Sequence, residues 1–339
     1  MTKSAIPEAA PPVVEEAVLE DLRRRLRAYR PVPLPVGLGW DRGVEPGYLA
    51  ELVETWESSY DWRRYEHRIR SWPWVLTGAG PTPVRALFQR SATPDAATVL
   101  LLHGWPDSVL RFEKLLPLLS HYDVVVPALP GYPFAAPVAA RGTSAEDIAE
   151  AVAAAMAEFG HDRYVVSAGD VGCDVAEVLA ARYPERVAAL HLTDVSQYHF
   201  LVDPPQDPSA VERVYIAHGR DWQAREGGYM HEQRTKPHTL AVALGDSPAG
   251  LLAWLVEKLR SWTDCGGDVE AVFTREQILT WVTAYWVSGV IGTSFTPYAT
   301  GSAKAARVRP PTVFTMFPRD LVNGPGGVRS SDFRRPLLA

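Results

Sequence analysis

Short apolar runs alternate with amphipathic stretches through the middle of the chain. The runs PVRALFQRS, ATVLLLHGWP, YDVVVPALPGYP, DRYVVSAGD and RVAALHLTDV predict strands, because each is short, apolar and bounded by turn residues. Two helices are predicted between them, SAEDIAEAVAAAMAEFG and VGCDVAEVLAARYP. The first has Thr143 or Ser144 as its N-cap and Gly160 as its stop. Strands that alternate with helices predict a parallel sheet covered on both faces.

Helical patterns flank this strand–helix core. Two amphipathic helices, EEAVLEDLRRRLRAYR and YLAELVETWESSYDWRRYEHRI, are predicted before it, joined by a proline-rich strap. A long helical insertion after the fifth strand is interpreted as a lid, and RPPTVFTMFPRD adds one more buried strand. The predicted organisation is a disordered N-terminus (1–12), an N-terminal strap region (13–80), the first part of the core (81–195), a helical lid (196–308), the last recognisable core strand (309–322) and a divergent tail (323–339).

The apolar run that begins at Val165 ends in a tight Ala-Gly-Asp-Val-Gly turn with Asp170 at its tip. Small residues at Ala168 and Gly172 suit a strand-to-helix turn that presents a nucleophile above the carboxyl edge of a parallel sheet. The helix N-terminus beneath the turn favours an anion. The alternative is an ordinary turn with an acidic N-cap, but the parallel-sheet context favours a nucleophile.

An earlier strand closes in His-Gly-Trp-Pro. In sheet enzymes of this kind, the loop after that strand supplies one backbone N–H of an oxyanion hole, and the residue after the nucleophile supplies the other. The predicted donors are therefore the N–H groups of Trp105 and Val171. Glycine and proline occur in turns of every kind, so this motif carries weight only together with the turn at Asp170.

Seven motifs along the chain resemble the epoxide hydrolases of the α/β-hydrolase fold, of the microsomal and juvenile-hormone type with their bacterial relatives. They are YDWRRYE, HGWPDS, AGDVGC, RYPERVAALHLTDV, GYMHEQRTKPHTLAVALGDSPAGLLAWLVEKLRSWTD, SFTPY and VFTMFPRDLV, and they cover about residues 13–323. The resemblance implies that fold, with an N-terminal strap and a helical lid. It also implies that Asp170 is the nucleophile, that Tyr229 and Tyr298 are the paired lid tyrosines, and that Asp320 orients a catalytic histidine. Trp105 and the two tyrosines are then expected to contact the substrate.

The chemistry of these side chains agrees with the implied roles. An aspartate is ionised at pH 7, so Asp170 needs no base to attack. Opening the strained ring leaves an alkoxide, which two phenol groups can hydrogen-bond and protonate; such help contributes about 10²–10⁴-fold. The product is an ester on Asp170, which water must then hydrolyse.

The sequence departs from the family pattern near Asn323. The family supplies the base for ester hydrolysis as a histidine after the last strand, in a Gly-Gly-His-Phe type stretch, whereas this sequence has no histidine after His238. It also lacks that strand and the helix that follows, as a truncated or divergent chain would. We therefore expect self-association through the sheet edge or reduced stability, and slow or absent ester hydrolysis. His103, His231 and His238 are expected to be structural.

Composition narrows the range of partners. A chain of 339 residues, 47% of them hydrophobic, suits one large domain or two closely packed ones, and a formal charge of −6 argues against a nucleic-acid surface. The sequence has no run of eighteen apolar residues, and MTKSAIPEAAPP does not resemble a signal peptide. Two cysteines make neither a disulfide framework nor a metal set. We expect a cytoplasmic protein without membrane, metal or cofactor, with a homo-oligomer as an open alternative.

Three other functions stay open. A haloalkane dehalogenase also uses an aspartate at this turn. It holds the departing halide with indole N–H groups, often one from the residue after the nucleophile, but that residue is Val171 in this sequence. A non-catalytic relative that binds a ligand or partner chain, or non-hydrolytic chemistry on a polyketide-type intermediate, would also fit. For an epoxide hydrolase, the many aromatic residues of the lid suit a small apolar or polycyclic epoxide. These residues, most of which are expected to pack within the lid, are Tyr215, Trp222, Tyr229, Trp254, Trp262, Trp281, Tyr285, Trp286, Phe295 and Tyr298.

Overall fold

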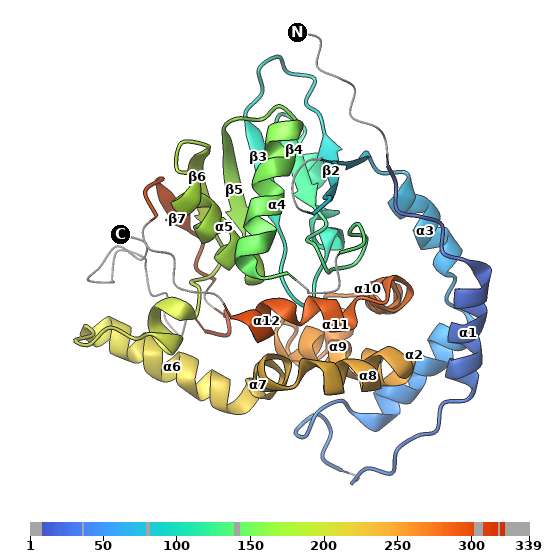
Figure 1. Cartoon of the computed structure of the whole chain (residues 1–339). Helices are drawn as coiled ribbons and strands as arrows, with labels where there is room; N and C mark the ends of the chain where they lie inside the picture. Colours follow the sequence, from blue (N-terminus) through green and yellow to red (C-terminus); the bar gives the residue numbers. More distant parts are fainter. Residues whose placement is uncertain are drawn as a thin grey trace.

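The strands form one sheet in the order β1-β2-β4-β3-β5-β6-β7 (Figure 1). The structure is a computed structural model that describes residues 9–35, 37–78, 82–138, 143–301, 308–317 and 319–322. Within these ranges the strands are β1 (Trp74–Leu76), β2 (Arg85–Gln89), β3 (Thr98–Leu102), β4 (Asp123–Pro127), β5 (Tyr164–Ala168), β6 (Val187–Leu192) and β7 (Thr312–Phe314).

The sheet is mixed, which corrects the expectation of a parallel one. Strands β4, β3, β5, β6 and β7 run parallel to one another, whereas β2 runs antiparallel to both of its neighbours, β1 and β4. Strand β1 is only three residues long and was not predicted. A continuous apolar run indicates that a strand is buried on both faces, but it carries no information on direction. The antiparallel pair therefore could not be told from its parallel neighbours.

Two helices cover one face of the sheet. The apolar residues of α4 (Ala145–Glu158) and α5 (Val171–Arg182) share a core with the inward side chains of β3, β4 and β5. Of the two predicted N-caps for α4, Ser144 is the one that the structure shows, with a capping box to Asp147. The opposite face packs against residues of the strap, such as Leu19, Trp62 and Ile69. This arrangement leaves the carboxyl ends of the parallel strands free to carry a site.

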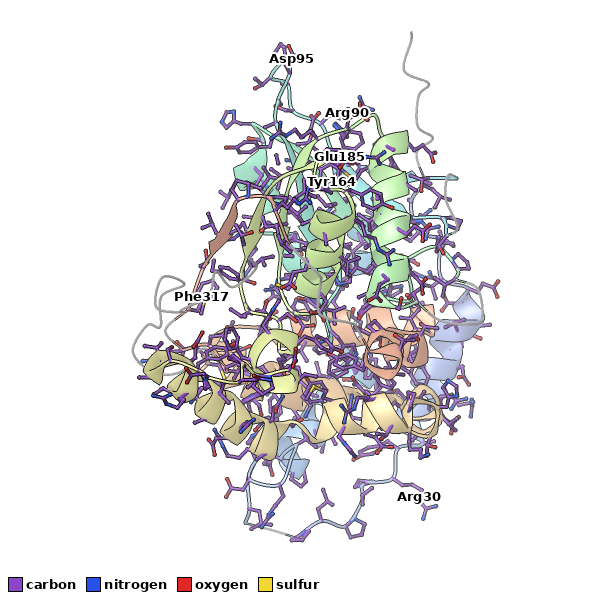
Figure 2. All side chains as sticks on the ribbon, turned by 60° about the vertical axis from the view of Figure 1, so that its left-hand side comes forward. Arg30, Arg90, Asp95, Tyr164, Glu185 and Phe317 are labelled. Atoms are coloured by element: carbon purple, nitrogen blue, oxygen red, sulfur yellow. The ribbon has the colours of Figure 1, made fainter. Side chains whose placement is uncertain are left out.

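Helices between β6 and β7 lie across that end of the sheet (Figure 1). Tyr164, which begins β5, and the polar residues Asp95 and Glu185 lie at the opposite end (Figure 2). The Tyr285 hydroxyl donates to the carbonyl of Asp107 at 3.1 Å, which ties this layer to the core loop. The elements are η3 (Tyr198–Val202), α6 (Ala210–Glu226), α7 (Gly228–Thr235), α8 (Pro237–Asp246), α9 (Pro248–Ser261), η4 (Val269–Ala271), α10 (Arg275–Ser288), α11 (Ile291–Ser294) and α12 (Thr296–Thr300).

The helices of this layer are short relative to a bilayer. In the described ranges, no single helix is long and apolar enough to cross a membrane. Two bent pairs reach that length and composition only when their halves are combined, across bends of 115° and 101°. They are α8 with α9, and α10 with α11 and α12.

The N-terminal region differs from its prediction in two ways. One predicted helix is in fact two, α2 (Pro46–Ser58) and α3 (Trp62–Arg70), because the Asp61 side chain caps a new helix start. Residues 9–12 are also placed against the core: Ala9 N–H donates to the Trp74 carbonyl at 3.0 Å, and Arg70 Nε donates to the Pro11 carbonyl at 2.9 Å. Backbone hydrogen bonds, which the apolar pattern does not reveal, hold this segment. Residues 1–8 and the predicted tail at 323–339 lie outside the described residues.

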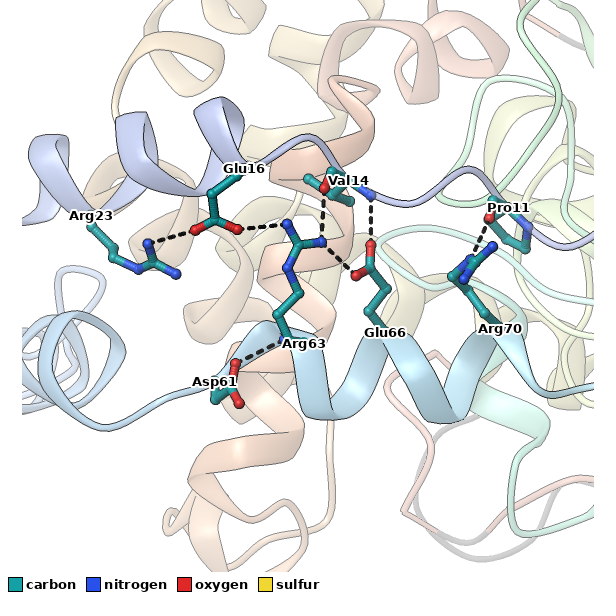
Figure 3. A network of polar contacts seen from close by, with 8 residues as sticks. All are labelled: Pro11, Val14, Glu16, Arg23, Asp61, Arg63, Glu66 and Arg70. Atoms are coloured by element: carbon teal, nitrogen blue, oxygen red, sulfur yellow. Dashed lines mark hydrogen bonds and ion pairs between the residues drawn. The ribbon is translucent and has the colours of Figure 1, made fainter.

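A buried carboxylate joins α3 to the segment that leads into α1 (Glu16–Arg27) (Figure 3). Glu66 is 6% exposed, and its two oxygens accept from the Val14 N–H at 2.6 Å and from Arg63 Nη1 at 2.7 Å. Arg63 also donates to the Val14 carbonyl and to Glu16, each at 2.7 Å. The strap region is therefore fastened to α3 by charge-assisted hydrogen bonds.

We expect Glu66→Ala to lower the free energy of unfolding by about 2 kcal/mol, because it leaves the Val14 N–H without its acceptor and removes one of the acceptors of Arg63. Urea denaturation at pH 7 measures the change. Glu16→Ala removes a carboxylate from the same arginine at a site 53% exposed, and should cost much less, because solvent screens an exposed ion pair. Equal losses in the two variants would contradict the role assigned to Glu66.

Candidate active site

Asp170 occupies a strained turn between β5 and α5. Its φ of 54° and ψ of −132° lie where a residue with a side chain is rarely found. The turn is possible because its neighbours are small. A Cβ added at Gly172 would lie 2.7 Å from the carbonyl oxygens of Leu102 and His103, and one added at Gly169 would lie 2.6 Å from Thr193 Oγ1. The strain aims the Asp170 carboxylate away from the sheet.

The loop after β3 supplies a hydrogen bond to this carboxylate. The register pairs Leu102 with Ala168, so the residues that follow each strand meet at the same edge. Trp105 N–H donates to Asp170 Oδ1 at 2.8 Å, and the Val171 N–H also hydrogen-bonds the carboxylate. The structure therefore brings both predicted oxyanion donors to the predicted nucleophile; their roles in catalysis stay predictions.

Opposing effects set the ionisation of Asp170. Burial raises its pKa, while the hydrogen bonds from Trp105 and Val171 and the positive charge of Arg111 lower it. Arg111 is itself held by Asp107, with Nη1 and Oδ2 2.9 Å apart. Neither residue was singled out from the sequence, although both belong to the segment that follows His-Gly-Trp-Pro. Burial is the largest of these effects, so the pKa of Asp170 is raised on balance, and the fixed donors and the nearby cation limit the rise.

The lid brings the two predicted tyrosines together. Tyr229 comes from α7 and Tyr298 from α12, and their ring centroids lie 5.9 Å apart with the planes at 77°. Trp105 stacks on Tyr229 at 5.3 Å and meets Tyr298 edge-on at 6.0 Å. Burial, and secondly the negative charge of Asp170, raises the pKa of each tyrosine. Both phenols therefore keep their protons at neutral pH and can donate hydrogen bonds.

The aromatic residues of the lid do more than pack against one another. Trp262 contacts Trp105 of the core loop with centroids 6.0 Å apart, and Phe295 does so at 6.1 Å. Trp262 also packs on Tyr229 at 4.7 Å. Part of the aromatic set thus forms a wall of the site around Trp105, beyond the internal packing expected from the sequence.

Two cavities meet at Asp170. The larger, of about 1000 Å³, includes Trp105, Asp170 and Asp320 in its lining. The smaller, of about 410 Å³, includes Asp170, Tyr229 and Tyr298. Asp170 therefore lines both cavities, the larger one with Trp105 and the smaller one with the two tyrosines.

Asp320 follows β7 and lines the larger cavity with Asp170. Its Oδ1 accepts from the Val322 N–H at 3.1 Å, and its negative charge contributes to raising the pKa of Asp194. The structure thus places the predicted orienting acid near the nucleophile. The role of Asp320 in orienting a catalytic histidine stays a prediction.

All nine histidines of the sequence lie in the described residues. His103 is fully buried, its Nε2 accepts from the Leu129 N–H at 3.2 Å, and burial lowers its pKa to about 3. It is therefore a neutral structural residue, as predicted. His238 lies in α8, while His231, in α7, lines the smaller cavity with Asp170.

Sequence reasoning missed Asp194, which follows β6. Its carboxylate accepts from the backbone N–H of Asp170 at 3.1 Å and from the Cys173 thiol at 2.6 Å, and it lines both cavities. Burial, and secondly the charge of Asp170, raises its pKa to about 6. The signal was present: β5 and β6 are adjacent parallel strands, so residues after their carboxyl ends must meet.

Metal chemistry has no obvious ligand set here. Among the described residues, no three His, Cys, Asp or Glu side chains converge as a metal ion would require. The Cys173 thiol donates a hydrogen bond to Asp194, and Cys265 is buried in another part of the structure. The expectation of a protein without metal or cofactor stays a prediction.

Comparison with known proteins identifies similar chains. Residues 8–112 match the family described as "Epoxide hydrolase N terminus", and residues 97–287 match "alpha/beta hydrolase fold". A relative from Stigmatella aurantiaca, named "Putative epoxide hydrolase", is 32% identical over 326 residues, which is 92% of this chain and 74% of the relative. The resemblance drawn from the seven motifs is thereby confirmed.

Two solved structures share the fold. An enantioselective mutant of epoxide hydrolase from Aspergillus niger has a TM-score of 0.84 and 27% identity, with 96% of this chain and 87% of that chain covered. Juvenile hormone epoxide hydrolase from the silkworm Bombyx mori has a TM-score of 0.75 and 26% identity, with 92% and 81% covered. The predicted α/β-hydrolase fold is therefore confirmed.

The ionisation of Asp194 predicts a pH dependence of stability. A carboxyl group whose pKa is higher in the folded state contributes stability at low pH, and this contribution is lost as pH rises from about 4 through about 6. Asp194→Asn removes that loss. We expect the stability of this variant, relative to the natural chain, to increase by about 2 kcal/mol between pH 4 and pH 7.

Urea denaturation at several pH values measures this difference. Asp41→Asn removes one carboxylate at an exposed position and is the matched control for net charge. If both variants show the same pH dependence relative to the natural chain, Asp194 does not titrate in this way.

Proposed function

The chain belongs to the epoxide hydrolases of the α/β-hydrolase fold, and on this premise we propose that it opens an epoxide by forming an ester on Asp170. One observation carries the proposal. The Asp170 carboxylate accepts from the Trp105 N–H at 2.8 Å and lines one cavity with the hydroxyl-bearing pair Tyr229 and Tyr298. A nucleophile and two proton donors therefore face a common space.

Ring opening follows from this arrangement. A carboxylate oxygen of Asp170 bonds to one epoxide carbon, and the bond from that carbon to the ring oxygen breaks. The ring oxygen leaves as an alkoxide, which takes a proton from the hydroxyl of Tyr229 or Tyr298. Since burial keeps both phenols protonated, the acid is in the correct state before the substrate arrives.

The two cavities suggest the kind of substrate. The larger holds about 1000 Å³ and the smaller about 410 Å³, which is ample for a bulky epoxide with substituents on either side of the ring. Trp105, Trp262 and Trp281 give the larger cavity an aromatic part, although charged residues also line it. These features support an apolar or polycyclic epoxide as the substrate class.

We also propose that a polypeptide of these 339 residues hydrolyses the ester slowly. Water needs a base, and His103 is committed to the Leu129 N–H and neutral. His191 and His199 bond to Ser167 and Glu177 at 2.8 Å each. These contacts hold the three rings in structural positions. None of the nine histidines lines the larger cavity, which Asp170 shares with Asp320, and His231 lines only the smaller one. The ester should therefore outlive the chemistry that forms it.

Intact-protein mass spectrometry after mixing with a reactive aryl epoxide tests the proposal. We expect a mass increase equal to the epoxide, on the peptide that contains Asp170, and its loss in Asp170→Asn. Tyr229→Phe should slow ester formation about 100-fold, because it removes a general acid. Tyr164→Phe is the matched control, since Tyr164 is buried at the far end of β5 (Figure 2), and it should leave the rate unchanged.

Other results would favour the competing functions. Chloride release from a chloroalkane, with no reaction of the epoxide, would indicate a dehalogenase. An isomer of the epoxide in place of the ester or diol would indicate non-hydrolytic chemistry. If neither the ester nor any product forms, the result would indicate a binding protein that has no catalytic activity. Rapid diol formation without a persistent ester would contradict only the proposal that hydrolysis is slow, and not the proposal that the ester forms.

A further inference from the structure

Lys258 is a buried cation that the proposed chemistry does not use. It lies on α9, is 7% exposed and lines the larger cavity. Its Nζ lies 5.5 Å from the ring centroid of Tyr229, 5.3 Å from that of Trp254 and 5.5 Å from that of Trp262. The residue belongs to the VEKLR segment, to which no role was assigned from the sequence.

Packing alone does not account for a lysine at this position. Removing an ammonium group from water costs free energy that a methionine or leucine of similar volume would not incur. Here the charge is compensated by an ion pair with Glu257 and by three aromatic faces. Glu257 is 19% exposed and is held in turn by the Ser261 hydroxyl at 3.3 Å. The cation is thus specifically supported.

Of the two lid tyrosines, Tyr229 is the one whose ring Lys258 contacts. Burial and the negative charge of Asp170 both raise the pKa of its phenol, which makes the group a weaker proton donor. Trp105, stacked on the ring at 5.3 Å, adds no charge. An ammonium group within cation–π distance acts in the opposite direction, because its attraction to the ring grows as negative charge develops on the phenol oxygen.

We propose that Lys258 is a positioning residue that makes Tyr229 a better acid for ring opening. The bond from Asp170 to the epoxide carbon forms, the ring carbon–oxygen bond breaks, and the proton of the Tyr229 hydroxyl moves to the departing oxygen. Lys258 gives up no proton; its charge stabilises the phenolate until water returns a proton to it. This inference rests on the proposed function, since it assigns Tyr229 to ester formation.

The rate of ester formation in a single turnover, followed by intact mass, tests this role whether or not the ester is later hydrolysed. Lys258→Met keeps the length of the side chain and removes its charge. We expect the rate at saturating epoxide to fall about 10- to 30-fold, with the half-saturating concentration unchanged. Lys258→Arg should restore the rate to within about threefold, because it keeps a cation that binds aromatic faces. Lys236→Met, at an exposed lysine, is the matched control.

A double-mutant cycle separates action through Tyr229 from general damage. In a Tyr229→Phe background, Lys258→Met should cause no further loss of rate. An equal loss in both backgrounds, or no rescue by arginine, would overturn the inference and leave the proposed function standing. If the natural chain forms ester and Lys258→Met forms it equally fast, the inference is also wrong. A natural chain that forms neither ester nor diol would overturn the proposed function itself, before Lys258 is tested.

Discussion

The positive φ of Asp170 is the constraint on which the site depends. It aims the carboxylate off the end of β5, and it is tolerated only because α5 begins directly against the end of β3. At Gly172 that approach leaves no room for a Cβ beside the carbonyl oxygens of Leu102 and His103. The same approach brings the Trp105 N–H to 2.8 Å from Asp170. One tight turn thus fixes the position of both the proposed nucleophile and its hydrogen-bond donor.

The lid supplies the two tyrosines that line a cavity with Asp170. Tyr229 and Tyr298 are 69 residues apart in the sequence numbering, on different helices, and they meet because Trp105 offers one ring for both to pack against. This contact joins the core loop to the lid, so the same residue, Trp105, positions both the proposed proton donors and the proposed nucleophile. The aromatic wall also excludes water from the phenols, which keeps them protonated.

Sequence reasoning succeeded where local pattern and parallel pairing decide position. The turn at Asp170 and the Trp105 loop could be predicted together, because residues after neighbouring parallel strands must meet. Asp194 obeys the same rule and could have been found. The direction of β2 could not be predicted, because a strand buried on both faces lacks the alternation of apolar and polar residues that is typical of antiparallel strands. Lys258 could not either: a lysine on an amphipathic helix is usually solvated, and only the tertiary packing of α9 against Tyr229 buries it.

Charge balance links the two halves of the proposed reaction. The negative charge of Asp170 is the second cause, after burial, of the raised pKa of Asp194, and it also raises the pKa of Tyr229. Ester formation removes that charge. The pKa of both neighbours then falls, so Asp194 more readily becomes a carboxylate beside the new ester and Tyr229 more readily carries transient negative charge. The first step of the reaction therefore prepares the electrostatics of the second, since the group that is consumed is the one that opposed the ionisation of its neighbours.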